Sequence, residues 1–332
     1  MHEHRVRRQA ITDVAAGATA VVRLGFDWVH RQTLHACKTR LFDRSYPDRR
    51  SSWVNQINMT CERGAALAKA YGPVMQIDLS DYLGVQKKSE EADLEGGAMI
   101  DDLIYWIGSH GRNAKGKDSP MRQRIIATRV GHARGGLQIE AVSKPYTMLL
   151  EDLVADERLK KFGLEQAATK APKSVGALNI EGLTATPDGH LLIGLRNPIP
   201  DGRAILIPLL NPRKLFEGER ARFGDPVTLD LKGLGIRSLG YHDGRYLIIA
   251  GNYAQGGNSH LFEWKPGDST AHWRKDIKLS GLNPEGMSFA SAPGEREFIV
   301  VSDDGTRTVD GQDCKKLKDS ALKRFRGIVL KL

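Results

Sequence analysis

Residues 179–198 read NIEGLTATPDGHLLIGLRNP, and their pattern of strands and turn indicates the fold. A short apolar strand is followed by a turn and then by a second apolar strand with a polar end. The turn contains Pro187-Asp188-Gly189, a combination typical of tight hairpins. The same order of features recurs in residues 93–113, 235–253 and 283–305. The stretch is therefore one copy of an internal repeat.

Each copy continues in the same way. A third strand is predicted in RQRIIATRV, RAILIPLL, SHLFEWK and RFRGIVLKL. A fourth strand is predicted before the next copy, in VMQIDLS, PVTLDLK and RKDIKLS. Four strands per unit, at roughly 45–60 residues per unit, are typical of a β-propeller blade. The sequence therefore predicts an all-β protein with a β-propeller of five blades, and six blades is the alternative.

Two segments depart from the repeat. Residues from about 150 to 172 have helix-forming composition, with an apolar face that contains Leu153, Leu159 and Phe162. This predicts a helical insertion between blades, within a propeller domain over residues 71–332. Residues 1–70 lack alternating strands and form an atypical N-terminal segment, either a divergent first blade or an extension. If the propeller closes, this segment supplies the missing blade and a closing strand for the last one.

The composition limits the class of protein. Hydrophobic residues make up 40% and charged residues 27%, which is typical of a soluble globular protein, and no apolar run reaches the roughly 20 residues of a membrane helix. Three widely spaced cysteines argue against a disulfide framework or a zinc cluster. A cytoplasmic location is expected, and an export signal after Arg7-Arg8 is the alternative.

The basic residues give a net charge of +9, but they are scattered and form no stripe interleaved with aromatic residues. Neither a nucleic-acid partner nor a membrane partner is expected from this pattern. A small anionic ligand fits the charge better. Nothing in the sequence indicates an oligomeric state.

Aligning the four repeats places polar residues in two tiers. The first tier lies in the first strand and contains Glu95, Glu181, Arg237 and Glu285. The second tier lies at the end of the second strand and contains His110, Asn197, Asn252 and Asp304. Because the first strand of a propeller blade lines the central channel, both tiers are expected to converge near the axis or one mouth of it.

The oxygen-bearing members of these tiers are the hard ligands that calcium prefers. The predicted metal ligands for calcium or another divalent cation are Glu95, Glu181, Glu285, Asn197, Asn252 and Asp304. Three converging carboxylates resist ionising together, and a bound cation would relieve this. In the alternative, the glutamates pair with Arg237, Arg196 or Arg112 and hold the blades together.

A catalytic site is predicted around His110, whose ordinary pKa near neutrality suits a general base. Arg112, Arg196 and Arg237 are its predicted cationic groups. In the alternative, residues 109–113 form a shaped loop that hydrogen-bonds to adjacent blades. The nearby Gly111-x-x-x-x-Gly116-Lys117 resembles a nucleotide-binding loop, but Asp118 stands where Ser or Thr would hold magnesium, and a strand follows instead of a helix. Nucleotide binding of that type is not expected.

Several long motifs carry a family resemblance. EADLEGGAMIDDLIYWIGSHGRNAKGK, NIEGLTATPDGHLLIGLRNPIPDGRAILIPLLNP, GLGIRSLGY and FRGIVLKL resemble the bacterial family catalogued as domain of unknown function 3616. The resemblance extends from about Gly72 to Leu332. It implies a β-propeller-like domain and no particular reaction.

A looser similarity links the chain to propellers that hydrolyse lactones or phosphate esters around calcium, in which an acidic residue followed by Gly also opens an inner strand. Two hypotheses follow. One is a cation-dependent hydrolase of a phosphate or carboxylic ester at the channel mouth, with His110 as base. The other is a non-catalytic propeller that binds a small anion or a protein partner. Similarity of fold does not choose between them.

Overall fold

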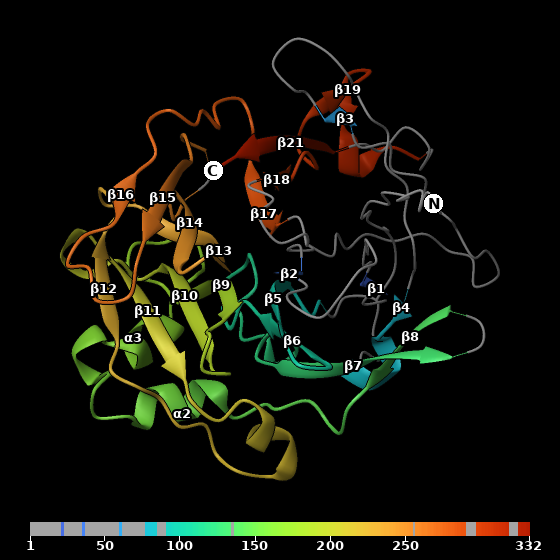
Figure 1. Ribbon diagram of the computed structural model, residues 1–332, viewed down its shortest axis with the longest axis vertical. Coiled ribbons are helices and arrows are strands. Elements are labelled where there is room, and N and C mark those ends of the chain that lie inside the picture. The colour runs from blue at the N-terminus through green and yellow to red at the C-terminus, as the bar shows by residue number, and fades with distance from the viewer. Residues whose placement is uncertain are drawn as a thin grey trace, which may run out of the picture.

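The computed structural model describes residues 21–22, 35–36, 60–61, 77–84, 91–133, 136–254, 256–289, 297–318 and 325–332. Within these residues, mainly antiparallel sheets are arranged around a common centre, and β5, β9, β13 and β17 lie toward it in their sheets (Figure 1). This is a β-propeller arrangement, and four blades are present in the described part of the chain. The all-β prediction is confirmed.

Each blade is one sheet, in which the strands follow one another from the centre outward. The first contains β5 (Leu94–Ile100), β6 (Leu103–Gly108), β7 (Ile125–Ala133) and β8 (Gly136–Ala141). The second contains β9 (Asn179–Ala185), β10 (Leu191–Asn197), β11 (Arg203–Leu209) and β12 (Val227–Asp230). The third contains β13 (Gly235–His242), β14 (Arg245–Gly251), β15 (His260–Trp264) and β16 (His272–Trp273). The fourth contains β17 (Pro284–Phe289), β18 (Glu297–Ser302), β21 (Arg326–Lys331) and β3 (Thr60–Cys61).

All four predicted third strands are confirmed, and PVTLDLK contains the predicted fourth strand β12. The prediction for RKDIKLS is wrong, because the outermost strand of the third blade is β16 and residues 274–280 form turns. The alternation that suggested a strand has another cause. Leu279 is buried and Ile277 is partly buried in the apolar cluster between the third and fourth blades, which also contains Phe298.

The N-terminal prediction falls mainly outside the described residues. Of the described parts, β1 (Val21–Val22) pairs with β4 (Ile77–Asp78) in a sheet separate from the four blades. β2 (His35–Ala36) pairs with β5 on its inner side and also contacts β17, and β3 runs parallel to β21. Two segments before residue 70 therefore add strands to the first and last blades.

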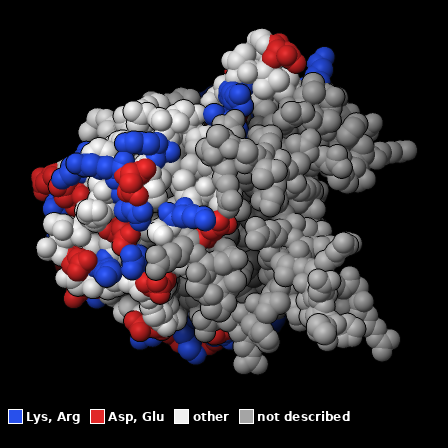
Figure 2. Space-filling view, turned by 45° about the horizontal axis from the view of Figure 1, so that its top comes forward, with Lys and Arg blue, Asp and Glu red and all other residues white. Residues whose placement is uncertain are grey.

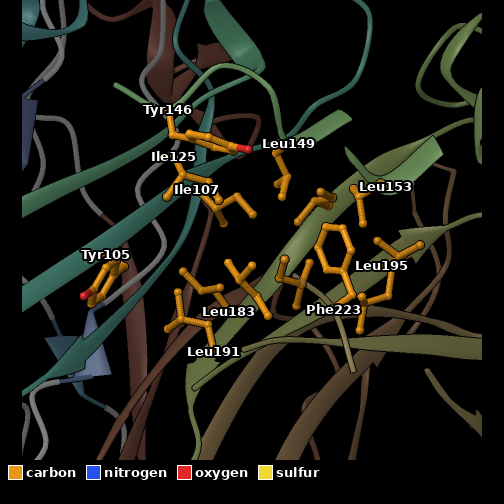
Figure 3. Packing of buried hydrophobic residues seen from close by; sticks show 14 of the residues in the cluster. Tyr105, Ile107, Ile125, Tyr146, Leu149, Leu153, Leu183, Leu191, Leu195 and Phe223 are labelled. Atoms are coloured by element: carbon orange, nitrogen blue, oxygen red, sulfur yellow. The ribbon is translucent and has the colours of Figure 1, made fainter. Parts of the chain in front are cut away.

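The chain between β8 and β9 carries α2 (Leu149–Ala155), a short turn of 3-10 helix (Lys160–Phe162) and α3 (Leu164–Ala168), where the sequence predicts a helical insertion. Leu149 and Leu153 are fully buried. They pack against residues of the first two blades, including Ile107 and Leu195, in one apolar cluster (Figure 3). The insertion is thus part of the core.

The remaining elements are short. They are α1 (Ser80–Leu83), the hairpin of β19 (Thr308–Val309) and β20 (Gln312–Asp313), and 3-10 turns at Pro120–Arg122, Pro200–Gly202, Arg213–Glu217 and Cys314–Lys316. None of the helices in the described ranges combines the length and apolar character needed to cross a membrane.

The connections differ in length at the two ends of the propeller. First and second strands are joined by tight turns such as Asp243-Gly244, where both residues have positive φ and the flanking pair is His242 opposite Arg245. That is the geometry of a two-residue hairpin whose twist matches the strands. Longer connections follow the second strands, at residues 109–124 and 252–259. The end of the propeller that carries these longer connections is where the inner strands begin and the second strands finish. We call it the rim.

Candidate functional site

A β-bulge interrupts the pairing of the first and second strands in every described blade. The register skips one residue in each inner strand, and the skipped residues are Glu95, Glu181, Arg237 and Glu285. They are the whole of the first predicted tier. A bulge leaves one residue unpaired and re-aims its side chain, so the shared position of this tier has a backbone cause. All four residues are buried.

The residue after the bulge is glycine in three of these strands, and packing explains two of them. A Cβ at Gly96 would lie 2.8 Å from Cβ of Leu183, and a Cβ at Gly182 would lie 2.8 Å from Cγ2 of Ile236. Neighbouring inner strands therefore approach too closely for a side chain there. The Glu-Gly pattern of the repeats reflects both the bulge and this contact.

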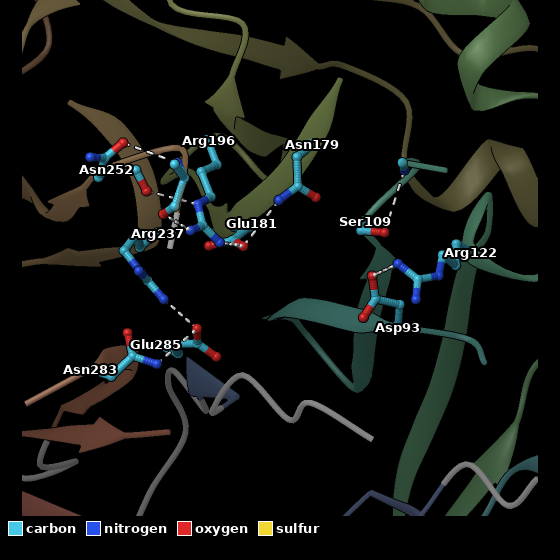
Figure 4. A network of polar contacts seen from close by, with 12 residues as sticks. Asp93, Ser109, Arg122, Asn179, Glu181, Arg196, Arg237, Asn252, Asn283 and Glu285 are labelled. Carbon is cyan, nitrogen blue, oxygen red and sulfur yellow. Dashed lines mark hydrogen bonds and ion pairs between the residues drawn. The ribbon is translucent and has the colours of Figure 1, made fainter. Parts of the chain in front are cut away.

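Glu181 is held by an arginine from the adjacent strand. Nη1 of Arg196 lies 2.6 Å from Oε1 of Glu181, which also accepts a hydrogen bond of 3.1 Å from Asn179 Nδ2 (Figure 4). The remaining guanidinium donors reach the next blade, where Nε contacts the carbonyl of Asn252 at 3.1 Å and Nη2 contacts that of Ala254 at 2.9 Å. Arg196 thus neutralises a buried carboxylate and joins two blades.

Arg237 and Glu285 form a second buried pair between the third and fourth blades (Figure 4). Arg237 Nη2 donates to Oε1 of Glu285, and Asn283 Nδ2 approaches the same oxygen at 3.4 Å. The arginine that replaces glutamate in the third repeat therefore serves the glutamate of the fourth. Pairing with arginine, the alternative predicted from the sequence, is what the structure shows for Glu181 and Glu285.

Asp304 is also held by an arginine. Its two oxygens accept from Nε and Nη2 of Arg326 in β21, both at 2.8 Å, and Ser302 Oγ donates to it at 2.9 Å. The two predicted amide ligands are engaged as well. Asn197 Nδ2 donates to Ser174 O at 2.8 Å, and Oδ1 of the exposed Asn252 accepts from a backbone N–H. Among the residues with described positions, no three His, Cys, Asp or Glu side chains gather closely enough to share a metal ion.

His110 lies just beyond β6 in the left-handed region, with φ of 53°. Its Nδ1 lies 2.8 Å from Gly108 O, and since a carbonyl only accepts, Nδ1 carries the proton. The ring is buried, and burial lowers the pKa of His110 to about 4. Its Nε2 has no hydrogen-bond partner within the described residues. His110 is therefore a neutral imidazole with an unused lone pair near neutral pH.

Residues 111–118 form a compact loop after His110. Asn113 Oδ1 accepts from the backbone N–H groups of Lys115 and Lys117 at 2.9 and 3.0 Å. Arg112 Nε donates to the carbonyl of Ala168 at 2.9 Å, so the loop is tied to the end of the helical insertion. Arg112 is half-buried, whereas Arg196 and Arg237 are buried and pair with Glu181 and Glu285. The shaped-loop alternative describes this backbone, and the predicted catalytic role of these residues remains a prediction.

One group of polar residues was missed by the sequence prediction. Asp93, Asn179 and Asn283 share a position two residues before the bulge. Both asparagines donate to the bulge glutamate of their own strand, whereas Asp93 pairs with Nη1 of Arg122 at 2.7 Å. The aligned repeats contain this tier, and recurrence of a polar residue at this position in three of the four repeats is the signal that could have revealed it.

The sheet order of the described residues defines a β-propeller arrangement. The chain belongs to the family described as Protein of unknown function (DUF3616), whose model matches residues 49–135 and 131–281. The family resemblance predicted from the motifs is confirmed. No curated protein matches the sequence.

Two solved structures show distant likenesses to the chain. A mutant of Trypanosoma rangeli sialidase that displays trans-sialidase activity is 13% identical with a TM-score of 0.36, over 66% of this chain and 34% of its own. Pseudomonas fluorescens PhoX in complex with vanadate is 15% identical with a TM-score of 0.29, over 64% of this chain and 49% of its own. The chain thus spans about a third to a half of these proteins. TM-scores this low do not establish a shared fold, and the blade assignment rests on the chain's own strand pairing.

Proposed function

We propose that the protein is a non-catalytic propeller that binds an anionic ligand on its rim. The observation that carries this is a group of cationic side chains, which we call the rim cluster. It consists of Arg112, Lys115, Lys117, Lys170 and Lys173. The two segments that hold it, residues 111–118 and 168–176, contain one acidic residue, Asp118.

The two segments lie against each other. Arg112 contacts the carbonyl of Ala168, and a Cβ at Gly116 would lie 3.6 Å from that of Ala171. Lys115, Lys117 and Lys173 are exposed. On the face drawn in Figure 2, basic and acidic side chains of the described residues are interspersed. A local excess of positive charge on a fixed loop attracts anions more than a mixed surface does.

The buried ion pairs support binding over metal-dependent catalysis. Glu181, Glu285 and Asp304 each face a guanidinium, so a cation would have to displace a charge-assisted hydrogen bond at each carboxylate. These buried ion pairs therefore suit a structural role in the propeller. We place the ligand at the rim instead.

The test is calorimetric titration of the whole protein with citrate and with pyrophosphate at low ionic strength. We expect binding to be lost in Lys115→Gln/Lys117→Gln. The control is Lys214→Gln/Lys265→Gln, which makes the same change in charge in connections at the opposite end of the propeller and should leave binding intact. Equal weakening by both variants, or no binding of any anion, would overturn the proposal.

A second candidate is the cation-dependent hydrolase of a phosphate or carboxylic ester, and His110 favours it. A buried, neutral imidazole with an unused Nε2 suits a general base. Calcium or another divalent ion would be held by Glu95 with the other predicted ligands, and Glu181, Glu285 and Asp304 would have to leave their arginines to bind it. A calcium-dependent rise in melting temperature that disappears in Glu95→Gln would support this candidate. No response to calcium or to a chelator would remove it.

We also propose that the complete propeller has five blades. β1 and β4 pair outside the four blades, which is consistent with an additional sheet. β2, which pairs with β5 and contacts β17, connects the two ends of the described arc. An experimental structure with six complete sheets would favour the alternative.

A further inference from the structure

We infer that His110 is an acid-sensitive latch for the rim, whose protonation opens residues 109–118 and opposes the binding of an anion there. This deepens the proposed function and rests on it. The loop that carries the exposed Lys115 and Lys117 begins directly after His110. The position of His110 therefore sets the point from which this loop leaves β6.

Neighbouring elements hold the backbone at the latch. The N–H of His110 donates to Arg122 O at 3.1 Å, and the carbonyl of Ser109 accepts from the N–H of Ile180 at 2.8 Å. These bonds join the end of β6 to residues 122–124 and to β9. His110 itself has φ of 53°, a left-handed conformation that is unfavourable for an ordinary side chain. The surrounding contacts have to maintain it.

The ring of His110 fits this position only when it is neutral. Its Nδ1–H donates to Gly108 O at 2.8 Å, and Nε2 has no hydrogen-bond partner within the described residues. A second proton would sit on Nε2 and would need an acceptor, in a residue that is 1% exposed. The charged ring is therefore stable only after it turns toward water. That movement breaks the bond to Gly108 O and removes one of the contacts that hold the left-handed backbone.

The charged residues on neighbouring elements give the protonated ring no acceptor. These elements are β5, residues 122–124, β9, the end of the helical insertion and the loop after His110. The charged residues that they carry here are Asp93, Glu95, Arg112, Arg122, Arg124, Lys170, Lys173 and Glu181. Asp93 and Glu181 pair with arginines at 2.7 and 2.6 Å (Figure 4). Among the described residues no carboxylate accepts from the ring. Burial is thus the main reason why the pKa of His110 is lowered to about 4.

The latch gives acid an effect that charge alone does not. In the open loop the ring has its ordinary pKa near 6.5, so opening takes up a proton and becomes easier as pH falls. Lys115 and Lys117 stay charged throughout this range, and a more positive protein would attract anions more strongly. Opening of the loop acts in the opposite direction. An anion that binds only the closed loop opposes opening in return, because the coupling is reciprocal.

The test is amide hydrogen exchange of the whole protein at pH 7 and pH 5, expressed as protection factors so that the chemical exchange rate cancels. We expect the protection factors of His110 and Ile180 to fall about 20-fold at pH 5, and those in β14 to stay unchanged. In His110→Asn, the protection factor of Ile180 should no longer respond. The matched control is His272→Asn, at an exposed histidine of β16, which should keep the response.

Sulfate tests the link to anion binding, because its charge is the same at both pH values. At about ten times its dissociation constant, sulfate should raise the protection factors of His110 and Ile180 about tenfold. Lys115→Gln/Lys117→Gln should remove this effect.

The outcomes separate the two proposals. Unchanged protection at pH 5, an equal response in His110→Asn, or a fall of the same size in β14 would overturn the latch while anion binding stands. If sulfate protects neither the parent protein nor the lysine variant, or protects both equally, anion binding at the rim falls. The regulation of that site then falls with it, whatever the response to acid.

Discussion

The burial of Glu181 depends on its partner, Arg196. A carboxylate without water is costly to bury, and here the cost is offset by Arg196 and by Asn179. The pair need not add stability compared with two apolar residues of equal volume. Removing one member is different, because the other charge then stays buried alone.

Glu181→Gln is therefore expected to lower the free energy of unfolding by about 3 kcal/mol. The control is Glu157→Gln, the same substitution at a side chain that is 81% exposed and paired with Lys160. Its expected effect is within about 0.5 kcal/mol. Urea denaturation of both variants measures the difference. Similar losses in the two variants would contradict the role assigned to the buried pair.

His110 gives the protein a dependence on pH. The unfolded chain binds a proton at His110 near pH 6.5, but burial lowers the pKa in the folded state to about 4. Between these values the unfolded state holds more protons, so stability falls as pH falls and is at its full value above pH 6.5. The expected loss between pH 7 and pH 5 is about 2 kcal/mol.

His110→Asn removes the titrating ring and keeps a residue that tolerates positive φ. The other ionisable groups are common to both proteins, so the difference between their denaturation midpoints at pH 7 and pH 5 isolates His110. An identical pH dependence in the variant would show that the imidazole is not held neutral by burial.

At the scale of elements, the bulge explains why the sequence predicted the tiers but not their geometry. Glu95 and its counterparts recur at one position, which an alignment of repeats detects. The strand register skips each of these residues, and this backbone irregularity cannot be recognised from the type of residue. The sequence also could not show which arginine pairs with which carboxylate. Arg326 is 22 residues from Asp304, and the pairing of β18 with β21 brings the two together.

The repeats were recognised partly from turn residues, and the hairpin at Asp243-Gly244 allows this assignment to be tested. Gly244 has φ of +77°, and a Cβ there would meet no atom within 4 Å. Gly244→Ala therefore costs only the strain of the left-handed backbone, about 1 kcal/mol. The matched control is Gly131→Ala in β7, which is equally uncrowded but has no positive φ and should be close to neutral. Equal melting temperatures for the two variants would contradict the turn assignment.

Across the chain, the four described blades could be recognised from four repeats because hairpins are local, whereas the predicted fifth blade depended on residues 1–70. The strands added by the N-terminal part could not be predicted in the same way. β2 and β3 are two residues long, too short for alternation, and their partners lie far along the chain. A pairing of this kind is set by tertiary contacts instead of local sequence.

These distant pairings predict how the propeller responds to truncation. A chain that begins at residue 71 lacks β1, β2 and β3, so N–H and C=O groups of β5 and β21 lose their partners. We expect amide hydrogen exchange to rise most in these two strands and least in β10, which lies between β9 and β11 in the second blade. A chain that begins at residue 21 is the control, because it keeps all three strands. If the longer truncation leaves β5 and β21 as protected as in the control, the ends of the described arc are held by contacts within the propeller and not by the N-terminal strands.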